Sequence, residues 1–238
     1  YYNEKRPFFI EQNQIFLTPI EIFYSRRIGS EPIQYPNSDD NLHPYSQLQS
    51  NIEYASKITR KGNDGYSYGL IFAQSKVEDD FYGFDGDRVN YSIFRAKKEI
   101  LSSKSYFGLI ATDFDFKNFK SNVYSLDGLF DISKYSLEFS YQFVKSNNDN
   151  NNGYGSTFEM DYISSELNIN DKIIFIESWI KYDMYDQDFN IDYLGYLFRN
   201  NIKTTNIGVV AYFENTKIFN SSDLSLKSIY SKNYDNVL

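Results

Sequence analysis

The clearest pattern in the chain is the alternation of apolar and polar side chains in the stretch from Lys134 to Ser146. Apolar or aromatic side chains occupy every second position, and polar ones lie between them; the apolar ones are Tyr135, Leu137, Phe139, Tyr141 and Phe143. Successive side chains of a strand point to opposite faces, so the pattern predicts a strand with one apolar and one polar face. Such a strand can line a soluble sandwich, or it can face lipid from a membrane barrel.

The same period-two alternation recurs along the chain and predicts an all-β fold. Helical periodicity is confined to two short stretches, near 10–16 and 45–49. The strands are expected near 20–28, 51–61, 66–77, 88–98, 104–115, 121–132, 134–146, 156–168, 172–184, 203–214 and 217–231.

The lengths of the strands and of their connections favour a barrel over a sandwich. Strands of about 9 to 15 residues exceed the globular mean of about 5 to 6 and match the roughly 9 to 11 that a tilted membrane-spanning strand needs. Long and short connections alternate, as they do in outer-membrane barrels. The long ones are expected at 29–50, 78–87, 147–155 and 185–202.

We therefore predict an antiparallel up-and-down transmembrane β-barrel, present in part, with about eleven strands in this segment. Residues 1–19 are expected to form a plug-like entry segment that enters the lumen or closes the periplasmic mouth, and residues 20–238 the barrel domain. A soluble sandwich with uneven loops remains the alternative.

The composition agrees with a β-rich chain. Aromatic residues make up 19% of the 238 residues, with 23 Tyr and 21 Phe, and these types favour strands. No run of 18 apolar residues suggests a transmembrane helix, and no signal peptide opens the chain. Because the chain starts without Met, we expect it to be a segment of a longer protein. The net charge of −8 argues against a nucleic-acid partner.

No catalytic constellation is recognisable, so we expect no enzyme activity and no cofactor. The chain has no cysteine and a single histidine, His43, which leaves nothing for a zinc site or a hydrolase triad. The acidic stretch at 78–87 does not have the spacing of a twelve-residue calcium loop.

Charged residues on the polar faces of the strands are the candidate ligand-binding or lumen residues. Two carboxylates could in principle perform glycosidase chemistry, but in a barrel they are expected to line the lumen and pair with basic side chains. Two adjacent arginines should point to opposite faces of one strand, with Glu11 pairing with one of them. The candidates are Arg26, Arg27, Arg95, Asp113, Asp127, Glu138, Glu159 and Asp161.

Aromatic residues near the strand ends allow two interpretations. They can stack on sugars, or they can form the girdles where a barrel meets the lipid headgroups. Residues of this kind include Tyr66, Tyr106, Trp179 and Tyr212.

Several motifs resemble those of the DUF5916 family of bacterial proteins. They are KRPFFIEQNQIF at 5–16, IFYSRRIG at 22–29, SKITRKGNDGYSYGLIFAQS at 56–75, GLIATDFD at 108–115 and FNIDYLGYLFRNN at 189–201. The chain departs from the family pattern at Gln12 and Arg60, where the family has Gly, and at Tyr193, where it has Asp.

The resemblance implies more than the residues themselves do. Members of the family typically carry an N-terminal domain like family 9 carbohydrate-binding modules, followed by a large outer-membrane-type barrel. The resemblance thus implies the outer membrane of a Gram-negative bacterium, the lipid bilayer as partner, a saccharide ligand and a carbohydrate-binding-like domain upstream. No catalytic residue is carried over, because the family has no established reaction.

We therefore expect an outer-membrane barrel with a binding or transport role, linked to saccharide or polymer uptake. The alternatives are a soluble glycan-binding or glycan-degrading β-domain and a structural barrel that anchors a surface complex. The direction of the apolar faces separates these readings, because a barrel places Leu137, Phe139 and Tyr141 outside, whereas a sandwich buries them.

Overall fold

A computed structural model of the chain describes residues 4–30, 49–78, 86–148, 151–169, 172–214 and 221–233. The helix expected near 45–49 lies outside these residues, apart from Gln49, where the first strand begins. His43 and most of the acidic stretch at 78–87 also lie outside them.

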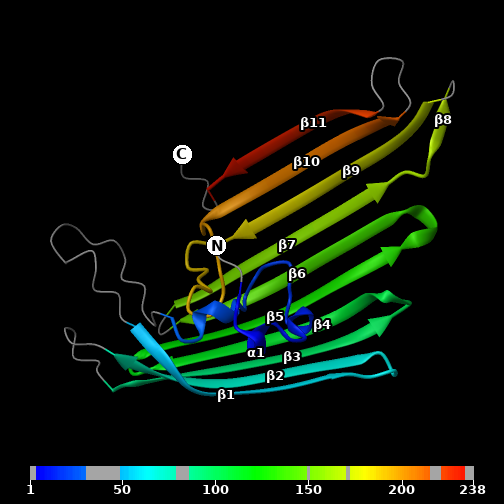
Figure 1. Ribbon diagram of the computed structural model, residues 1–238. Coiled ribbons are helices and arrows are strands. Elements are labelled where there is room, and N and C mark those ends of the chain that lie inside the picture. Colours follow the sequence, from blue (N-terminus) through cyan, green and yellow to red (C-terminus); the bar gives the residue numbers. More distant parts are fainter. Residues whose placement is uncertain are drawn as a thin grey trace.

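Ten strands form one antiparallel meander in which each strand pairs with the next, and the short β8 pairs only with β9 (Figure 1). Their bounds are β1 Gln49–Lys61, β2 Tyr66–Glu78, β3 Arg88–Ile100, β4 Ser102–Phe116, β5 Phe119–Ile132, β6 Leu137–Asn148, β7 Asn151–Ile163, β8 Leu167–Ile169, β9 Lys172–Tyr185, β10 Ile202–Glu214 and β11 Ser221–Lys232. The predicted all-β, antiparallel, up-and-down fold is confirmed. Within the described residues the sheet is open, with β1 and β11 as its edges, so closure into a barrel stays a prediction.

Helical structure is limited to short turns. They are α1 Pro7–Ile10 and the 3₁₀ turns η1 Asn13–Ile15, η2 Ser25–Arg27 and η3 Ser133–Tyr135. The first two fall near the helical stretch expected at 10–16. None of the helices in the described part of the chain is long and apolar enough to cross a membrane.

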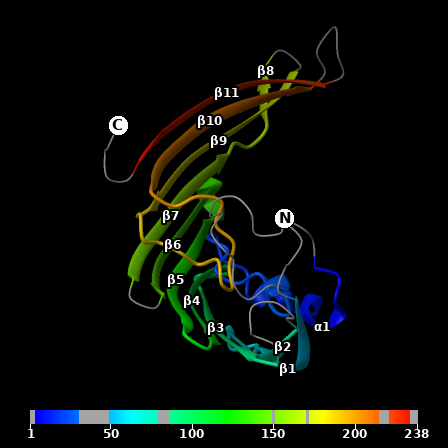
Figure 2. The same ribbon diagram turned by 90° about the vertical axis from the view of Figure 1, so that its left-hand side faces the viewer.

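The sheet is strongly curved, and the N-terminal residues lie on its concave side (Figure 2). We call this concave side the inner face and the opposite side the outer face. The strands β2, β4, β6 and β9 all end at the same edge of the sheet, which we call the loop end. The opposite edge is the turn end.

The hydrophobic core lies between the inner face and two covering segments, residues 4–30 and 186–201. The sheet contributes side chains from the loop-end half of its inner face, such as Ile71, Ile93 and Phe114. The covering segments contribute Phe9, Phe16, Ile20, Ile22, Phe23, Ile28, Phe189, Ile191 and Leu194. The core is therefore inside the curve of the sheet, where a lumen was expected.

The expected strand at 20–28 is wrong. Ile22 and Phe23 are neighbours, and both are buried, because this segment lies between the sheet and residues 186–201. Its end is turned into η2 by Arg6, whose guanidinium donates hydrogen bonds to the carbonyl oxygens of Ser25 (2.8 Å) and Ile28 (2.7 Å). Tertiary contacts have thus overridden a local extended pattern.

The long loop expected at 147–155 is also wrong. β6 continues to Asn148 and β7 starts at Asn151, so the polar composition does not end the pairing. The reason lies on the inner face, where Phe189 packs against Gly153 and Gly155. The side chain of Asn148 also donates a hydrogen bond of 2.8 Å to the carbonyl oxygen of Asn190.

Candidate functional site: the inner face of the sheet

The centre of the inner face holds a buried ion pair between two of the predicted residues. Arg95 of β3 donates two hydrogen bonds to the carboxylate of Asp127 of β5, with 2.7 Å between Nη2 and Oδ2. Both side chains are completely buried. A bidentate pair of this kind offsets part of the cost of removing two charges from water. It neutralises charge in the interior and leaves neither group ready for catalysis.

Arg95 also holds the N-terminal segment. Its Nε donates a hydrogen bond of 3.1 Å to the carbonyl oxygen of Ile15, the last residue of η1. The next residue, Phe16, lies over Gly69 of β2, where a Cβ would come within 2.5 Å of the ring. The ion pair therefore fixes one point at which residues 4–30 contact the sheet.

Three further side chains of the inner face bind the backbone or side chains of residues 4–30. Lys57 of β1 donates hydrogen bonds to the carbonyl oxygens of Phe8 and Glu11. Gln142 of β6 accepts a hydrogen bond from the backbone N–H of Ile20 and donates one to its carbonyl oxygen at 3.3 Å. Thr59 donates to the side-chain oxygen of Gln12. These contacts occupy the backbone polar groups of a segment that has little secondary structure of its own.

Glu4 and Arg6 close the N-terminal segment on itself. The Glu4 carboxylate accepts hydrogen bonds from the Arg6 side chain at 2.7 and 2.9 Å and from the Ser25 hydroxyl at 2.8 Å. Burial by itself would raise the pKa of the Glu4 carboxyl, but the hydrogen bonds from the Arg6 side chain, the Arg6 backbone and Ser25 together lower that pKa from 4.5 to about 2.

Residues 186–201 interlock with residues 4–30. The backbone N–H of Tyr24 donates a hydrogen bond of 2.7 Å to the carbonyl oxygen of Leu194. The backbone N–H of Tyr196 donates one of 2.9 Å to the carbonyl oxygen of Glu21. We call the two segments together the plug. Their backbone pairing means that neither can leave the inner face without breaking contacts to the other.

The plug contains the ion pair of Arg27. Its guanidinium lies 3.9 Å from the Asp192 carboxylate and donates a hydrogen bond of 3.1 Å to the carbonyl oxygen of Gly195. Burial raises the pKa of the Asp192 carboxyl, although Leu197 and Arg27 act in the opposite direction. The expected pairing of an arginine with Glu11 is therefore wrong for Arg27. Arg26 is half-buried in η2, so the two arginines do not share a strand.

The turn-end half of the inner face brings the other predicted carboxylates together beyond the plug. Cross-strand pairing places Glu138 of β6 opposite Asp161 of β7, and Asp161 opposite Trp179 of β9. Glu159 forms an ion pair of 3.2 Å with Lys181. The three predicted carboxylates and an indole ring thus share one partly exposed surface.

Trp179 is held flat by its neighbours. A Cβ at Gly208 of β10 would lie 2.1 Å from the indole, so the ring occupies the space left by the missing side chain. Its Nε1 donates a hydrogen bond of 3.3 Å to the side chain of Asn206. The sequence allowed a sugar-stacking or a girdle role for Trp179. Only the strand register shows that Trp179 of β9 lies opposite Gly208 of β10.

Asp113 does not belong to this surface. The β4 register places it opposite Ser92 and Asn122, on the outer face, where its carboxylate accepts a hydrogen bond of 3.0 Å from Asn122. The expectation that Asp113 shares a polar face with Asp127 is therefore wrong. At this end of β4 the inner positions are Phe114 and Phe116, which are buried in the core, so the apolar side is the inner one.

The outer face is apolar and exposed over the middle of the sheet. Neighbouring strands present side chains such as Phe72, Leu109, Leu126, Phe143 and Ile180, each at least 39% exposed. Leu137, Phe139 and Tyr141, which a barrel would place outside and a sandwich would bury, lie on this face and are partly exposed.

The described residues contain no group of three or more His, Cys, Asp or Glu side chains arranged to hold a metal ion. Sequence reasoning missed Gln142 and Asp192 as site residues. Nothing local distinguishes them, because each acquires its role from a segment distant in the chain.

Comparison with known proteins gives one family match. The model of the family described as "Domain of unknown function (DUF5916)" matches residues 1–80, which include the first three motifs noted above. Searches of the curated proteins and of the solved structures gave no match. The matched residues contain the first segment of the plug together with β1 and β2, so over this part the chain is similar to the DUF5916 family.

Proposed function

We propose that this chain forms part of an outer-membrane β-barrel whose outer face contacts lipid and whose inner face handles a ligand. The observation that carries the proposal is the distribution of side chains. A fully buried ion pair and a packed plug lie on the inner face, while large apolar side chains stand exposed on the outer face. Exposed apolar surface on this scale marks a contact with another apolar phase.

The dimensions of the apolar band support contact with a bilayer. On β5 the outer positions Tyr124, Leu126, Gly128, Phe130 and Ile132 follow one another without a charge. They span about 27 Å along the strand, which at a strand tilt of about 35–45° covers about 19–22 Å of the roughly 25 Å apolar band of outer-membrane barrels.

Charged and polar groups border this band at the loop end. On the outer face, Arg88 pairs with Glu53 at 2.9 Å, and Lys120 pairs with Asp115 at 3.7 Å. Such a border is expected where a strand passes from hydrocarbon to water.

The ligand side of the proposal concerns the turn-end half of the inner face. There Trp179 offers an apolar ring, and Glu138, Glu159 and Asp161 offer hydrogen-bond acceptors. An apolar platform with a few convergent polar groups suits a saccharide, whose hydroxyls donate to carboxylates. We therefore propose a saccharide or another polymer-derived molecule as the ligand, bound or transported at the cell surface. A saturable change of Trp179 fluorescence with soluble oligosaccharides, abolished by Asp161→Ala, would support this assignment.

The test of the membrane proposal is the lipid exposure of the two faces. Single cysteines can be placed in this cysteine-free chain at Leu109 and Leu126 on the outer face and at Glu138 and Ser140 on the inner face. In reconstituted vesicles, the outer cysteines should react with a membrane-confined thiol reagent and the inner ones with an aqueous reagent. Shielding of Leu109→Cys and Leu126→Cys from both reagents would contradict the proposal and favour a soluble glycan-binding sandwich. Labelling of these two by the aqueous reagent alone would also contradict it.

A further inference from the structure

Two aromatic rings of the inner face, Trp179 of β9 and Tyr212 of β10, lie outside the hydrophobic core. The register places Trp179 opposite Gly208 and Tyr212 four residues further along β10, so both side chains belong to the same face. The Tyr212 side chain is 40% exposed. A tyrosine on the inner face of a barrel does not meet lipid, so the sugar-stacking role fits Tyr212 and the girdle role does not.

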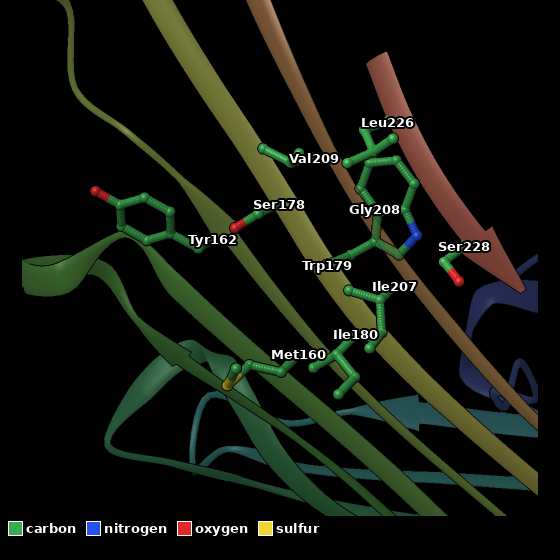
Figure 3. Close-up of a pocket in the computed structure, with 10 residues that line it drawn as sticks. All are labelled: Met160, Tyr162, Ser178, Trp179, Ile180, Ile207, Gly208, Val209, Leu226 and Ser228. Atoms are coloured by element: carbon green, nitrogen blue, oxygen red, sulfur yellow. The ribbon is translucent and has the colours of Figure 1, made fainter.

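The sheet holds both rings in place. The indole of Trp179 lies over Gly208, and its Nε1 donates a hydrogen bond of 3.3 Å to Asn206. Figure 3, which is centred on a groove of the outer face of these strands, shows the ring reaching across β10 toward β11. The hydroxyl of Tyr212 donates a hydrogen bond of 3.1 Å to the Glu177 carboxylate. Rings that are fixed before a ligand arrives lose little conformational entropy on binding.

The glycine under the indole differs from other glycines that a ring covers on the inner face. Gly69 lies under Phe16, and Gly155 lies under Phe189; both rings come from the plug and are buried. At Gly208 the covering ring comes from the sheet itself and is partly exposed. Part of the indole surface is therefore available to a ligand.

An apolar strip connects the two rings along β10. Val210 lies between Gly208 and Tyr212 on the same face and is partly exposed. The four residues from Gly208 to Tyr212 correspond to about 13 Å along the strand. Because this separation exceeds the width of one sugar ring, a single sugar cannot contact both aromatic rings, whereas an oligosaccharide that runs along β10 can.

Polar side chains border the strip on both sides. They are exposed or partly exposed and include hydrogen-bond donors and acceptors: Asp161, Glu177, Asp223, Ser225 and Lys227. A sugar has C–H groups on its ring faces and hydroxyls, which both donate and accept hydrogen bonds, around its edge. The strip and its borders therefore match a sugar chain lying flat on the sheet. Because carboxylates outnumber the one ammonium group, a neutral sugar chain fits better than an anionic one.

We propose that the inner face binds an extended neutral oligosaccharide along β10, with one sugar unit stacked on Trp179 and a more distant unit on Tyr212. The inference rests on the proposed function, because it needs the inner face to bind a saccharide. It adds a second contact, at Tyr212, and it makes the site selective for the length of the sugar chain.

The chain contains its own reporter for the test, because Trp179 is the only tryptophan. We would refold the chain in a detergent without a sugar headgroup and follow its fluorescence during titrations. The probes are single sugars, disaccharides and longer members of the cello-, xylo- and malto-oligosaccharide series. For a series that binds, the dissociation constant should fall with chain length and level off once the chain spans both rings. The reason is that an already bound ligand makes the second contact.

Three variants test the part played by Tyr212. Tyr212→Ala should weaken binding of the long oligosaccharides about tenfold and leave binding of single sugars unchanged. Tyr212→Phe keeps the ring and should keep the dependence on chain length. Tyr162→Ala is the matched control and should change nothing, because it removes a tyrosine of similar exposure, 38%, from the outer face.

The outcomes separate this inference from the proposed function. Saturable binding that does not depend on chain length and is unchanged in Tyr212→Ala would overturn the inference and leave the saccharide site standing. Equal weakening of single sugars and long oligosaccharides by Tyr212→Ala would also overturn it, because Tyr212 would then not be a separate contact. No fluorescence change with any saccharide, with the strand content intact by circular dichroism, would overturn both the inference and the saccharide site.

Discussion

Arg95 and Asp127 lie on β3 and β5, and their side chains meet across the strand between them, directly over Gly108 of β4. The ion pair therefore joins three strands and, through the carbonyl oxygen of Ile15, the plug as well. It is the point at which the sheet and the plug depend on each other most directly.

Asp127→Asn should destabilise the fold by about 3–5 kcal/mol, because it leaves the Arg95 charge buried without a counter-charge. Urea unfolding of the refolded chain, followed by circular dichroism, measures this loss. Combining Asp127→Leu with Arg95→Met should cost much less than the sum of the single changes, since an apolar pair can replace a buried ion pair. Additive losses would show that the two side chains do not act as a pair.

Gly108→Ala should lower the free energy of unfolding by about 1–3 kcal/mol, because a Cβ at this position would lie 2.7–2.9 Å from the Arg95 guanidinium. The same substitution in an Arg95→Met background is the control. If the clash is with the guanidinium, the cost should fall there, since a methionine side chain can move aside. An equal cost in both backgrounds would point to a different cause.

Arg27 and Asp192 should be coupled in stability, because they link the two segments of the plug at 3.9 Å. A double-mutant cycle with Arg27→Ala and Asp192→Ala should give an interaction free energy of at least about 0.5 kcal/mol. The cycle of Arg27→Ala with Glu11→Ala should be additive within about 0.5 kcal/mol. The reverse result would restore the pairing expected from sequence.

Glu4 should give the fold a dependence on acid pH. Because its folded pKa of about 2 lies below its ordinary value of 4.5, its stabilising contribution is complete above pH 4.5 and is lost as the pH falls toward 2. Glu4→Gln should therefore destabilise the protein at neutral pH and flatten the stability curve between pH 4.5 and 2. Unfolding by urea at a series of pH values measures both effects. Glu11→Gln, which removes an exposed carboxylate from the same segment, is the control, and a curve for Glu4→Gln as steep as that of the unmodified chain would contradict the assignment.

The sequence by itself determined the strands and most of their faces. Alternation at Leu137, Phe139 and Tyr141 is a property of neighbouring residues, and a strand converts it directly into two faces. The antiparallel meander followed as well, because short connections between long strands allow few other pairings. All ten strands expected between 51 and 231 overlap the observed ones.

Only the tertiary structure decided what covers each face. At 20–28 an extended pattern became a turn because Arg6 binds the carbonyl oxygens of Ser25 and Ile28. At Asp113 the polar side of β4 became the outer side. The reason is that Phe114, on the opposite side, packs into the core formed with the apolar side chains of the plug. The pairs of Arg95 with Asp127 and of Arg27 with Asp192 join residues 32 and 165 positions apart. Local periodicity reports which side of a strand is apolar, but only packing between distant segments decides whether that side meets the core or the surroundings.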